Sequence, residues 1–305
     1  MNVAIIDLGT NTFNLLICSV SCNSYKILHA TKRAPKMGQG GIQSNIITTE
    51  AYLRSIQALQ ELNDIILSYS CNKVIAIGTS ALRNAKNSEE FCNEVKRRFG
   101  FSIQIISGLQ EAEYIYWGNR LAYDWGQQTA LILDIGGGSN EIIIATNSTI
   151  LWKHSFENGM QRIISSASPT YPLTQQNKDY IHSYLESTFE LLYKLTHTYS
   201  IDILIGSSGP FDTFRTILST NIDNSIPWCQ IPYNSLKQLH QQLISSTIEE
   251  INSIEGMDAA RVEMLPIASS IALHICNNLH IQTIIQSDYS LKEGVIYSLL
   301  CNNYE

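Results

Sequence analysis

The chain repeats one short pattern at two places in its 305 residues, and this repeat limits the folds open to it. The pattern is an apolar run, a turn containing Asp and Gly, and a second apolar run. It reads VAIIDLGTNTFNLLI from Val3 and ALILDIGGGSNEIII from Ala130. Glycine permits the backbone angles of tight turns, so each copy predicts two strands joined by a turn. A repeated unit requires a repeated architecture.

Two further patterns recur in the same order. A strand ending in Gly and small hydroxyl residues appears as VIAIGTSALRN from Val74 and as ILIGSSGPFDT from Ile203. A strand, a turn with Ser and a segment with Glu appear as IQIISGLQEAEYIYWG from Ile103 and IQTIIQSDYSLKEGVIY from Ile281. Apolar spacing predicts helices over Thr49–Ser70, Asn87–Phe99, Asp179–Thr198 and Asn234–Ile254. The order predicts two α/β domains of similar topology that face each other across a ligand-binding cleft.

Composition narrows the functional class. Apolar residues make up 44% of the chain, which is enough for two hydrophobic cores without stabilising metals or disulfides. The net charge of −7 argues against a nucleic-acid partner, although residues 1–118 carry eleven Lys/Arg against nine Asp/Glu. Seven scattered cysteines form no C-x-x-C pair, and no targeting segment or long apolar stretch is visible. We therefore expect a cytoplasmic protein with no membrane partner.

The two turns have the composition of anion-binding sites. Glycines and hydroxyl residues at a turn present successive backbone N–H groups, and such a nest binds phosphate. Three consecutive glycines in a sheet are costly, and they make sense where a backbone must approach a ligand. The predicted phosphate-binding residues are Gly9, Thr10, Asn11 and Thr12 in the first turn and Gly136, Gly137, Gly138 and Ser139 in the second. Asp7 and Asp134 precede the turns and are candidate ligands for a divalent cation.

These residues resemble the exopolyphosphatase/guanosine pentaphosphate phosphohydrolase family, within the actin–Hsp70–sugar kinase superfamily. Six motifs carry the resemblance in order along nearly the whole chain: DLGTNTFNLLI, KMGQGG, TSALRNAKN, ISGLQEAEYIYWG, DIGGGSNE and SDYSLKEG. The resemblance implies two RNase H-like, actin-like ATPase domains. We expect the first at residues 1–118, with a helix near 289–305 packed back on it, and the second at 119–288.

The resemblance also implies roles for single residues. Glu111 would be the general base that activates water, and Asp134 and Glu141, with Asp7, would hold Mg²⁺. Arg83 would grip a phosphate, and we expect Lys36 to contact phosphate as well. A metal and an arginine neutralise charge while a carboxylate orients water, which is what phosphoryl transfer needs.

The function implied is release of terminal orthophosphate from inorganic polyphosphate. Two alternatives stay open: the same chemistry on guanosine pentaphosphate, and a weakly active regulator that binds polyphosphate or nucleotide. A sugar kinase or actin-like ATPase fits the motif spacing less well. Family resemblance alone suggests a homodimer.

Four positions depart from the family pattern and bear on substrate choice. They are Glu113, Asn140, Ser290 and Lys292. Retention of a long polyphosphate needs many cationic side chains, and the N-terminal half offers Lys32, Arg33, Lys36, Arg83 and Lys86. We therefore expect frequent release of intermediates and a preference for short or medium polyphosphate.

Overall fold

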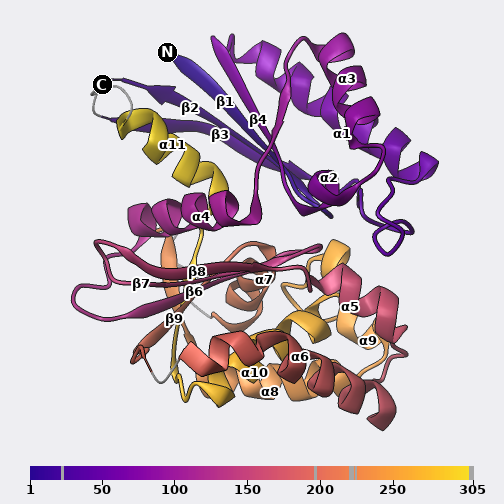
Figure 1. The fold of residues 1–305 in the computed structure, drawn as a ribbon, viewed down its shortest axis with the longest axis vertical. Helices are drawn as coiled ribbons and strands as arrows, with labels where there is room; N and C mark the ends of the chain where they lie inside the picture. The colour runs from indigo at the N-terminus through magenta and orange to yellow at the C-terminus, as the bar shows by residue number, and fades with distance from the viewer. Residues whose placement is uncertain (22–23, 196–197, 220–222, 224, 302–305) are drawn as a thin grey trace. The chain divides into compact units, whose positions relative to one another are not determined.

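The chain forms two compact α/β units, each built on one β-sheet. A computed structural model describes residues 1–305 except 22–23, 196–197, 220–222, 224 and 302–305. The first unit comprises Met1–Gly118 and Leu291–Glu305, and the second comprises Asn119–Ser290. Figure 1 shows the sheet and helices of each unit by label.

The sheet of the first unit has five strands in the order β3-β2-β1-β4-β5. Their bounds are β1 Asn2–Leu8, β2 Phe13–Val20, β3 Tyr25–Arg33, β4 Lys73–Gly78 and β5 Ile103–Ile105. The first three strands are antiparallel neighbours, whereas β4 runs parallel to both β1 and β5. The predicted first hairpin is therefore confirmed as β1 and β2.

Among its described residues, five helices belong to this unit in whole or in part. They are α1 Thr49–Ser68, α2 Ser80–Asn84, α3 Ser88–Phe99, α4 Gly108–Ala122, which runs on into the second unit, and α11 Leu291–Cys301. Thr48 caps α1 by accepting from the N–H of Ala51, and its apolar stripe, including Leu59 and Leu62, is buried. The α3 helix ends at Gly100, whose φ of 78° suits glycine. The described part of the expected C-terminal helix is α11, which contacts β1 and β2.

The sheet of the second unit repeats this topology with one added strand. Its order is β10-β11-β9-β6-β7-β8. The bounds are β6 Ala130–Ile135, β7 Asn140–Ala145, β8 Ile150–Phe156, β9 Ile203–Ser207, β10 Trp228–Pro232 and β11 Thr283–Ser287. Reading from β8, three antiparallel strands precede parallel β9 and β11, as in the first unit. This is the RNase H-like arrangement, so the predicted α/β fold class is confirmed.

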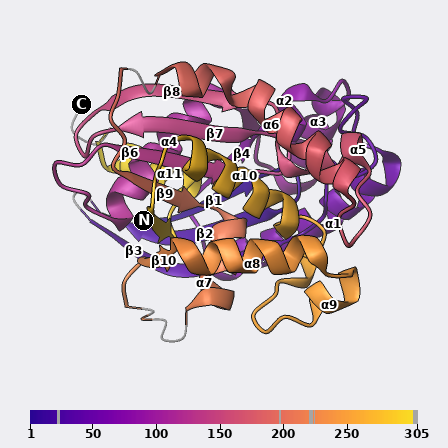
Figure 2. The ribbon, with the colours of Figure 1, turned by 90° about the horizontal axis from the view of Figure 1, so that it is seen from below.

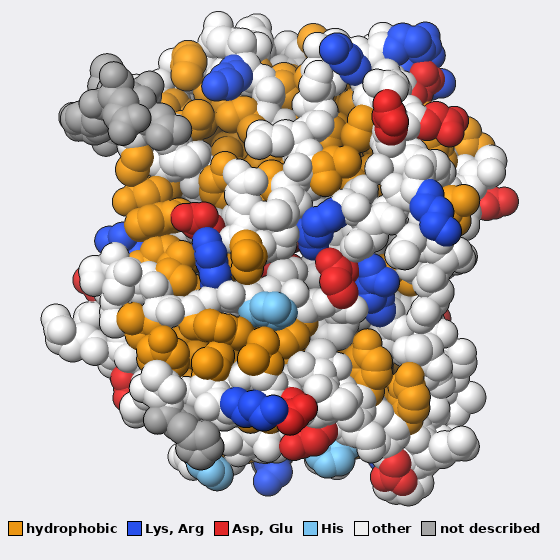
Figure 3. All heavy atoms as spheres, in the orientation of Figure 1, with side chains coloured by type: hydrophobic (Ala, Val, Ile, Leu, Met, Phe, Trp, Pro, Cys, Tyr) orange, Lys and Arg blue, Asp and Glu red, His pale blue; other side chains and the backbone are white. Residues whose placement is uncertain are grey.

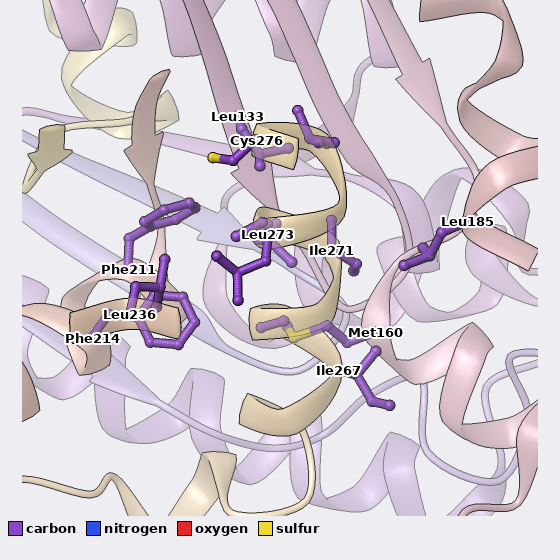
Figure 4. Close-up of a cluster of buried hydrophobic side chains, with 14 of the residues drawn as sticks. Leu133, Met160, Leu185, Phe211, Phe214, Leu236, Ile267, Ile271, Leu273 and Cys276 are labelled. Atoms are coloured by element: carbon purple, nitrogen blue, oxygen red, sulfur yellow. The ribbon is translucent and has the colours of Figure 1, made fainter. Parts of the chain in front are cut away.

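Helices of the second unit enclose its largest core. They are α5 Met160–Ala167, α6 Gln175–Leu195, α7 Gly209–Leu218, α8 Tyr233–Ser245, α9 Ile248–Asn252 and α10 Leu265–Asn278, with a 3-10 turn at Ala259–Arg261. Figures 1 and 2 show α8 and α10 side by side, and the two are in contact. Buried side chains of α10 meet Met160, Leu133 and Phe211 in the cluster of Figure 4. In the described ranges, no helix is both long and apolar enough to cross a membrane.

One predicted helix is wrong in its extent. The sequence predicted a single helix over Asn234–Ile254, whereas α8 ends at Ser245 and α9 begins at Ile248. Thr247 starts the new helix with a capping box: its hydroxyl accepts from the N–H of Glu250, whose carboxylate accepts in return from the N–H of Thr247. Apolar residues continue at helical spacing across the break, so periodicity alone hides it.

A histidine between two helices of the second unit is held in its neutral form. Ser269 donates its hydroxyl proton to the carbonyl of Pro266 at 2.9 Å, so it accepts from Nδ1–H of His240, also at 2.9 Å. Burial, and then the charge of Lys178, lowers the pKa of His240 to about 4. The unfolded chain therefore takes up this proton at a higher pH than the folded chain does.

Replacement of this histidine is expected to reduce acid sensitivity. Because the unfolded state binds the extra proton between pH 6.5 and about 4, His240 removes stability as the pH falls through that window. The loss is at most about 3 kcal/mol. Denaturant unfolding of His240→Asn at pH 7.5 and pH 4 is expected to show a smaller stability loss than the wild type. The exposed His280→Asn is the matched control, and equal losses in all three proteins would contradict the assignment.

Candidate functional site

The first glycine-containing turn joins β1 to β2 and is fixed from behind by a later segment. Gly9 N–H donates to the carbonyl of Thr12 at 3.0 Å, which closes the turn. Gly38 N–H donates to Thr10 O at 2.9 Å, and Lys36 N–H donates to Asn11 O at 3.0 Å. The carbonyls of the turn are thus bound, and Lys36 lies directly against it.

The second turn joins β6 to β7 and is built in the same way. Gly136 N–H donates to Ser139 O at 3.0 Å, the same bond at the same place as in the first turn. The segment at the start of α5 then donates three consecutive N–H groups to this turn. They run from Gly159 to Gly138 O at 3.2 Å, from Met160 to Gly136 O at 3.0 Å and from Gln161 to Gly137 O at 2.8 Å.

Binding of the carbonyls leaves N–H groups of the second turn available. Among the residues that the structure describes, Gly137, Gly138 and Ser139 donate their N–H groups to no protein acceptor. Successive N–H groups presented by a turn form a nest with a positive potential. The geometry can therefore accept an anion with several oxygens, such as phosphate.

Two buried carboxylates flank this turn. Asp134 is the next-to-last residue of β6 and Glu141 is the second residue of β7. They are direct cross-strand partners, so both side chains lie on one face of the sheet. Asp134 is 8% exposed and Glu141 is 1% exposed. Hydroxyl groups hold one oxygen of each: Ser155 donates to Glu141 Oε1 at 2.6 Å, while Ser207 and Ser290 donate to Asp134 Oδ2.

The first hairpin carries a different pair at the equivalent positions. Asp7 faces Asn14 across the strands, and Asn14 Nδ2 donates to Asp7 Oδ2 at 2.9 Å. In both units a hydroxyl residue follows the strand that runs parallel to the first strand of the hairpin, β4 or β9. Thr79 donates to Leu8 O at 3.3 Å, and Ser208 donates to Ile135 O at 3.2 Å. The repeat therefore extends to single hydrogen bonds, but only the second hairpin pairs two acids.

The remaining predicted residues, Glu111 and Arg83, form an ion pair within the first unit. Glu111 lies in the first turn of α4, where helix N-termini stabilise negative charge. Its Oε2 accepts from a terminal guanidinium nitrogen of Arg83 at 2.9 Å, and the same nitrogen donates to Ile106 O at 3.1 Å. Glu111 is 8% exposed, so a charged partner is needed to hold it there.

The departures from the family pattern lie in different surroundings. Ser290 donates to Asp134 at 2.6 Å, and Asn140 donates to the carbonyl and side-chain oxygens of Asn158. Lys292 pairs with Glu293 at 2.9 Å. Glu113 is exposed on α4.

Sequence reasoning missed the residues that support the turns from behind. Beside the first turn, Arg54 donates to the carbonyls of Pro35 and Lys36. Beside the second they are Asn158, Gly159 and Arg162, with Ser155 and Ser207 donating to the flanking carboxylates. Most lie well away from the turn in the sequence, so no local pattern indicates them, although Ser207 falls inside a repeated motif.

The donor set beside the second turn fits a magnesium ion that keeps much of its water. Within the described ranges, no group of three or more His, Cys, Asp or Glu is arranged to hold a metal. Mg²⁺ is commonly bound by one or two carboxylates together with substrate phosphates, rather than by a dedicated protein cage. Asp134 and Glu141 supply oxygen ligands of that kind next to the proposed phosphate nest.

The fold and the site define a protein of two RNase H-like units, each with a glycine-containing turn of this design. Residues 16–303 match the model of the Ppx/GppA phosphatase family. The chain therefore belongs to the Ppx/GppA phosphatase family, and membership makes it a phosphoanhydride hydrolase.

Individual relatives agree with this placement. The chain is 29% identical to a Haemophilus influenzae protein assigned as an exopolyphosphatase, over 97% of this chain and 91% of that protein. It is 25% identical to the guanosine-5'-triphosphate,3'-diphosphate pyrophosphatase of Aeromonas salmonicida, of which it spans 60%. The crystal structure of an exopolyphosphatase from Cytophaga hutchinsonii matches with a TM-score of 0.95 and 33% identity, covering 99% of this chain and 98% of that one.

Gly159→Ala is expected to displace the second turn. An added Cβ would lie 2.5 Å from backbone atoms of Gly137 and Gly138, which cannot rotate away as a side chain can. The φ of −57° at Gly159 suits any residue, so the effect is steric alone. We expect phosphatase activity to fall at least ~10-fold and stability to fall by about 1–3 kcal/mol, as for overpacking. Phosphate release and thermal unfolding measure both effects.

Gly126→Ala is the control for this prediction. Its φ is +60° and nothing lies within 4 Å of an added Cβ, so it changes backbone strain without a clash. Wild-type activity in Gly159→Ala would show that the turn does not depend on this close approach.

Proposed function

We propose that this protein is an exopolyphosphatase that releases terminal orthophosphate from inorganic polyphosphate. The observation that carries the proposal lies within one hairpin of the second unit. There, three N–H groups without protein acceptors among the described residues stand between two buried carboxylates, Asp134 and Glu141. An anion nest directly beside a cation-binding pair suits a substrate composed of phosphates bound with a divalent metal.

The two acids would hold Mg²⁺ on the phosphate oxygens. Like charges on directly opposed residues repel, and a divalent cation offsets that repulsion. Ser207 and Ser290 fix one oxygen of Asp134, which orients the carboxylate. The bound metal would neutralise charge that develops on the phosphoryl oxygens.

Glu111 is proposed to orient the attacking water and take its proton. The pair with Arg83 holds the carboxylate in one position, and its burial limits competing water. Arg83 is proposed to share its guanidinium with a substrate phosphate, because five donors in a plane exceed what one carboxylate oxygen accepts. Positioning and charge relief of this kind are the main requirements of phosphoryl transfer.

A comparison of substrates tests the proposal. Phosphate release with Mg²⁺ is measured on tripolyphosphate, on long polyphosphate, on guanosine pentaphosphate and on ATP. Faster turnover of polyphosphate supports an exopolyphosphatase. Faster turnover of guanosine pentaphosphate would instead identify a guanosine pentaphosphate phosphohydrolase. Binding of polyphosphate with negligible release would identify a regulator instead.

The charges of the first unit favour short or medium chains in that comparison. Arg33 is committed to Glu61 at 2.5 Å, which removes one of the cations available to a long polyanion. Figure 3 shows basic and acidic side chains intermixed on the face in view rather than gathered into a basic track. A ladder of intermediates from long polyphosphate is the result consistent with this distribution.

Glu111→Gln is expected to lower kcat by about 10²–10⁴-fold, because an amide cannot accept the proton of the attacking water. The KM is expected to stay within a few-fold, since the amide oxygen still accepts from Arg83. Steady-state kinetics measures both constants. Glu113→Gln, an exposed change two residues along the same helix, is the matched control. A Glu111→Gln enzyme with turnover near that of the control would remove Glu111 from the mechanism.

Activity is expected to require Mg²⁺ and to depend on the acid pair. Excess chelator should abolish phosphate release, and Asp134→Asn or Glu141→Gln should raise the Mg²⁺ concentration for half-maximal activity at least ~10-fold, because each removes one charged ligand. Binding of Mn²⁺ followed by electron paramagnetic resonance gives a readout independent of turnover. Asp179→Asn, exposed on α6, is the control. Full activity in chelator would refute the metal requirement.

A further inference from the structure

The guanidinium of Arg162 contacts the peptide group that presents one of the N–H donors of the second turn. Arg162 lies on α5, and its Nε donates to the carbonyl of Gly138 at 2.9 Å. That carbonyl also accepts from Gly159 N–H at 3.2 Å, so it carries two hydrogen bonds, one of them charged. The contact joins a partly buried cation to the backbone of the turn, because the Arg162 side chain is 18% exposed.

The carbonyl of Gly138 and the N–H of Ser139 are the two ends of one peptide group. A charged donor on the carbonyl polarises the group, so the N–H at the other end becomes a stronger donor. Ser139 N–H is one of the three donors that have no protein acceptor in the described part of the chain. Arg162 thereby acts on the anion nest without entering it.

Other contacts hold the guanidinium and the neighbouring backbone in place. A terminal nitrogen of Arg162 pairs with Glu157 at 3.1 Å. Asn140, the residue after Ser139, donates to the carbonyl of Asn158 at 3.1 Å and to its side-chain oxygen at 2.9 Å. The segment from Glu157 to Arg162 is therefore tied to both the turn and the strand that leaves it.

We infer that Arg162 is a positioning residue that sets the phosphate affinity of the Gly136–Ser139 turn. This inference rests on the proposed function of the turn. Arg162 makes no contact with substrate in this role. Its side chain fixes the Gly138 peptide and strengthens the Ser139 N–H as a donor. The cation also lies one peptide group away from the bound anion, where its charge adds to the attraction.

Binding of tripolyphosphate by isothermal titration calorimetry, without Mg²⁺ and without turnover, tests the inference directly. Arg162→Met keeps an unbranched apolar stem but loses both charge and donor, and its Kd is expected to rise about 10-fold. Arg162→Lys keeps the charge, and the increase in its log Kd is expected to be about a third smaller than that of Arg162→Met. The matched control is Arg97→Met, which removes a surface arginine that also pairs with a glutamate, and its Kd should equal that of the wild type.

Kinetics and thermal unfolding separate this role from a purely structural one. The turn holds substrate before and during the reaction, so Arg162→Met should raise KM with kcat within about three-fold. The unfolding midpoint should stay within a few degrees of the wild type. The ¹⁵N shift of the Ser139 amide should move in Arg162→Met and partly return in Arg162→Lys, which a folding defect would not produce.

The outcomes are distinct. Wild-type protein that binds tripolyphosphate while Arg162→Met binds it within two-fold overturns the inference and leaves the proposed function standing. A weaker Kd in Arg162→Met with no partial rescue by lysine, together with a large fall in the unfolding midpoint, also overturns it. Wild-type protein that neither binds nor hydrolyses any phosphate anion overturns the proposed function and the inference with it.

Discussion

The hydrogen bonds that bind the carbonyl groups of the two turns from behind are the constraint on which the candidate site depends. In a peptide backbone every residue has a donor and an acceptor to satisfy. The second turn has the carbonyls of Gly136, Gly137 and Gly138 satisfied by three consecutive N–H groups at the start of α5. The N–H groups of the turn are then the ones left for a ligand. The protein's own N–H groups occupy the carbonyls of the turn, and this determines that the turn can bind an anion.

The same constraint explains why glycine recurs in the supporting segments. Two backbones meet at hydrogen-bonding distance only where no Cβ intervenes. A Cβ on Gly159 would lie 2.5 Å from the backbone of the turn, and one on Gly38 would lie 2.4 Å from the methyl group of Thr10. Glycine is therefore required in the supporting segment as well as in the turn. The two units solve the same steric problem with unrelated segments.

The equivalence of the hairpins makes their one chemical difference informative. Asp7 faces Asn14, and the amide stabilises the carboxylate by donating to it at 2.9 Å. Asp134 faces Glu141, so the second hairpin concentrates two acids where the first has one. An acid opposite an amide places one negative charge on the face, whereas two buried carboxylates place two charges that a cation stabilises. The change of one residue, Asn14 to Glu141, is what supports the proposal that the second hairpin holds the cation.

Much of the fold was predictable because its signals are local. Alternating apolar runs around Asp-Gly turns predicted both hairpins, since strand pairing and turn chemistry agree over a few residues. The break between α8 and α9 was missed because α8 ends at Ser245, and Thr247 and Glu250 start α9, without interrupting the apolar spacing. A capping box inside a periodic run should therefore outweigh the periodicity.

The supporting contacts of the site could not be predicted for a different reason. Arg162 reaches Gly138 across 24 residues of sequence, and Ser290 reaches Asp134 across 156. Such contacts depend on the register of the sheet and on the direction in which a helix leaves it, and neither leaves a pattern near the turn. The family motifs indicated which backbone is expected to meet a ligand. A peptide N–H becomes a stronger donor when another group donates to the carbonyl of the same peptide. The side chains that do so can be identified only in the folded chain.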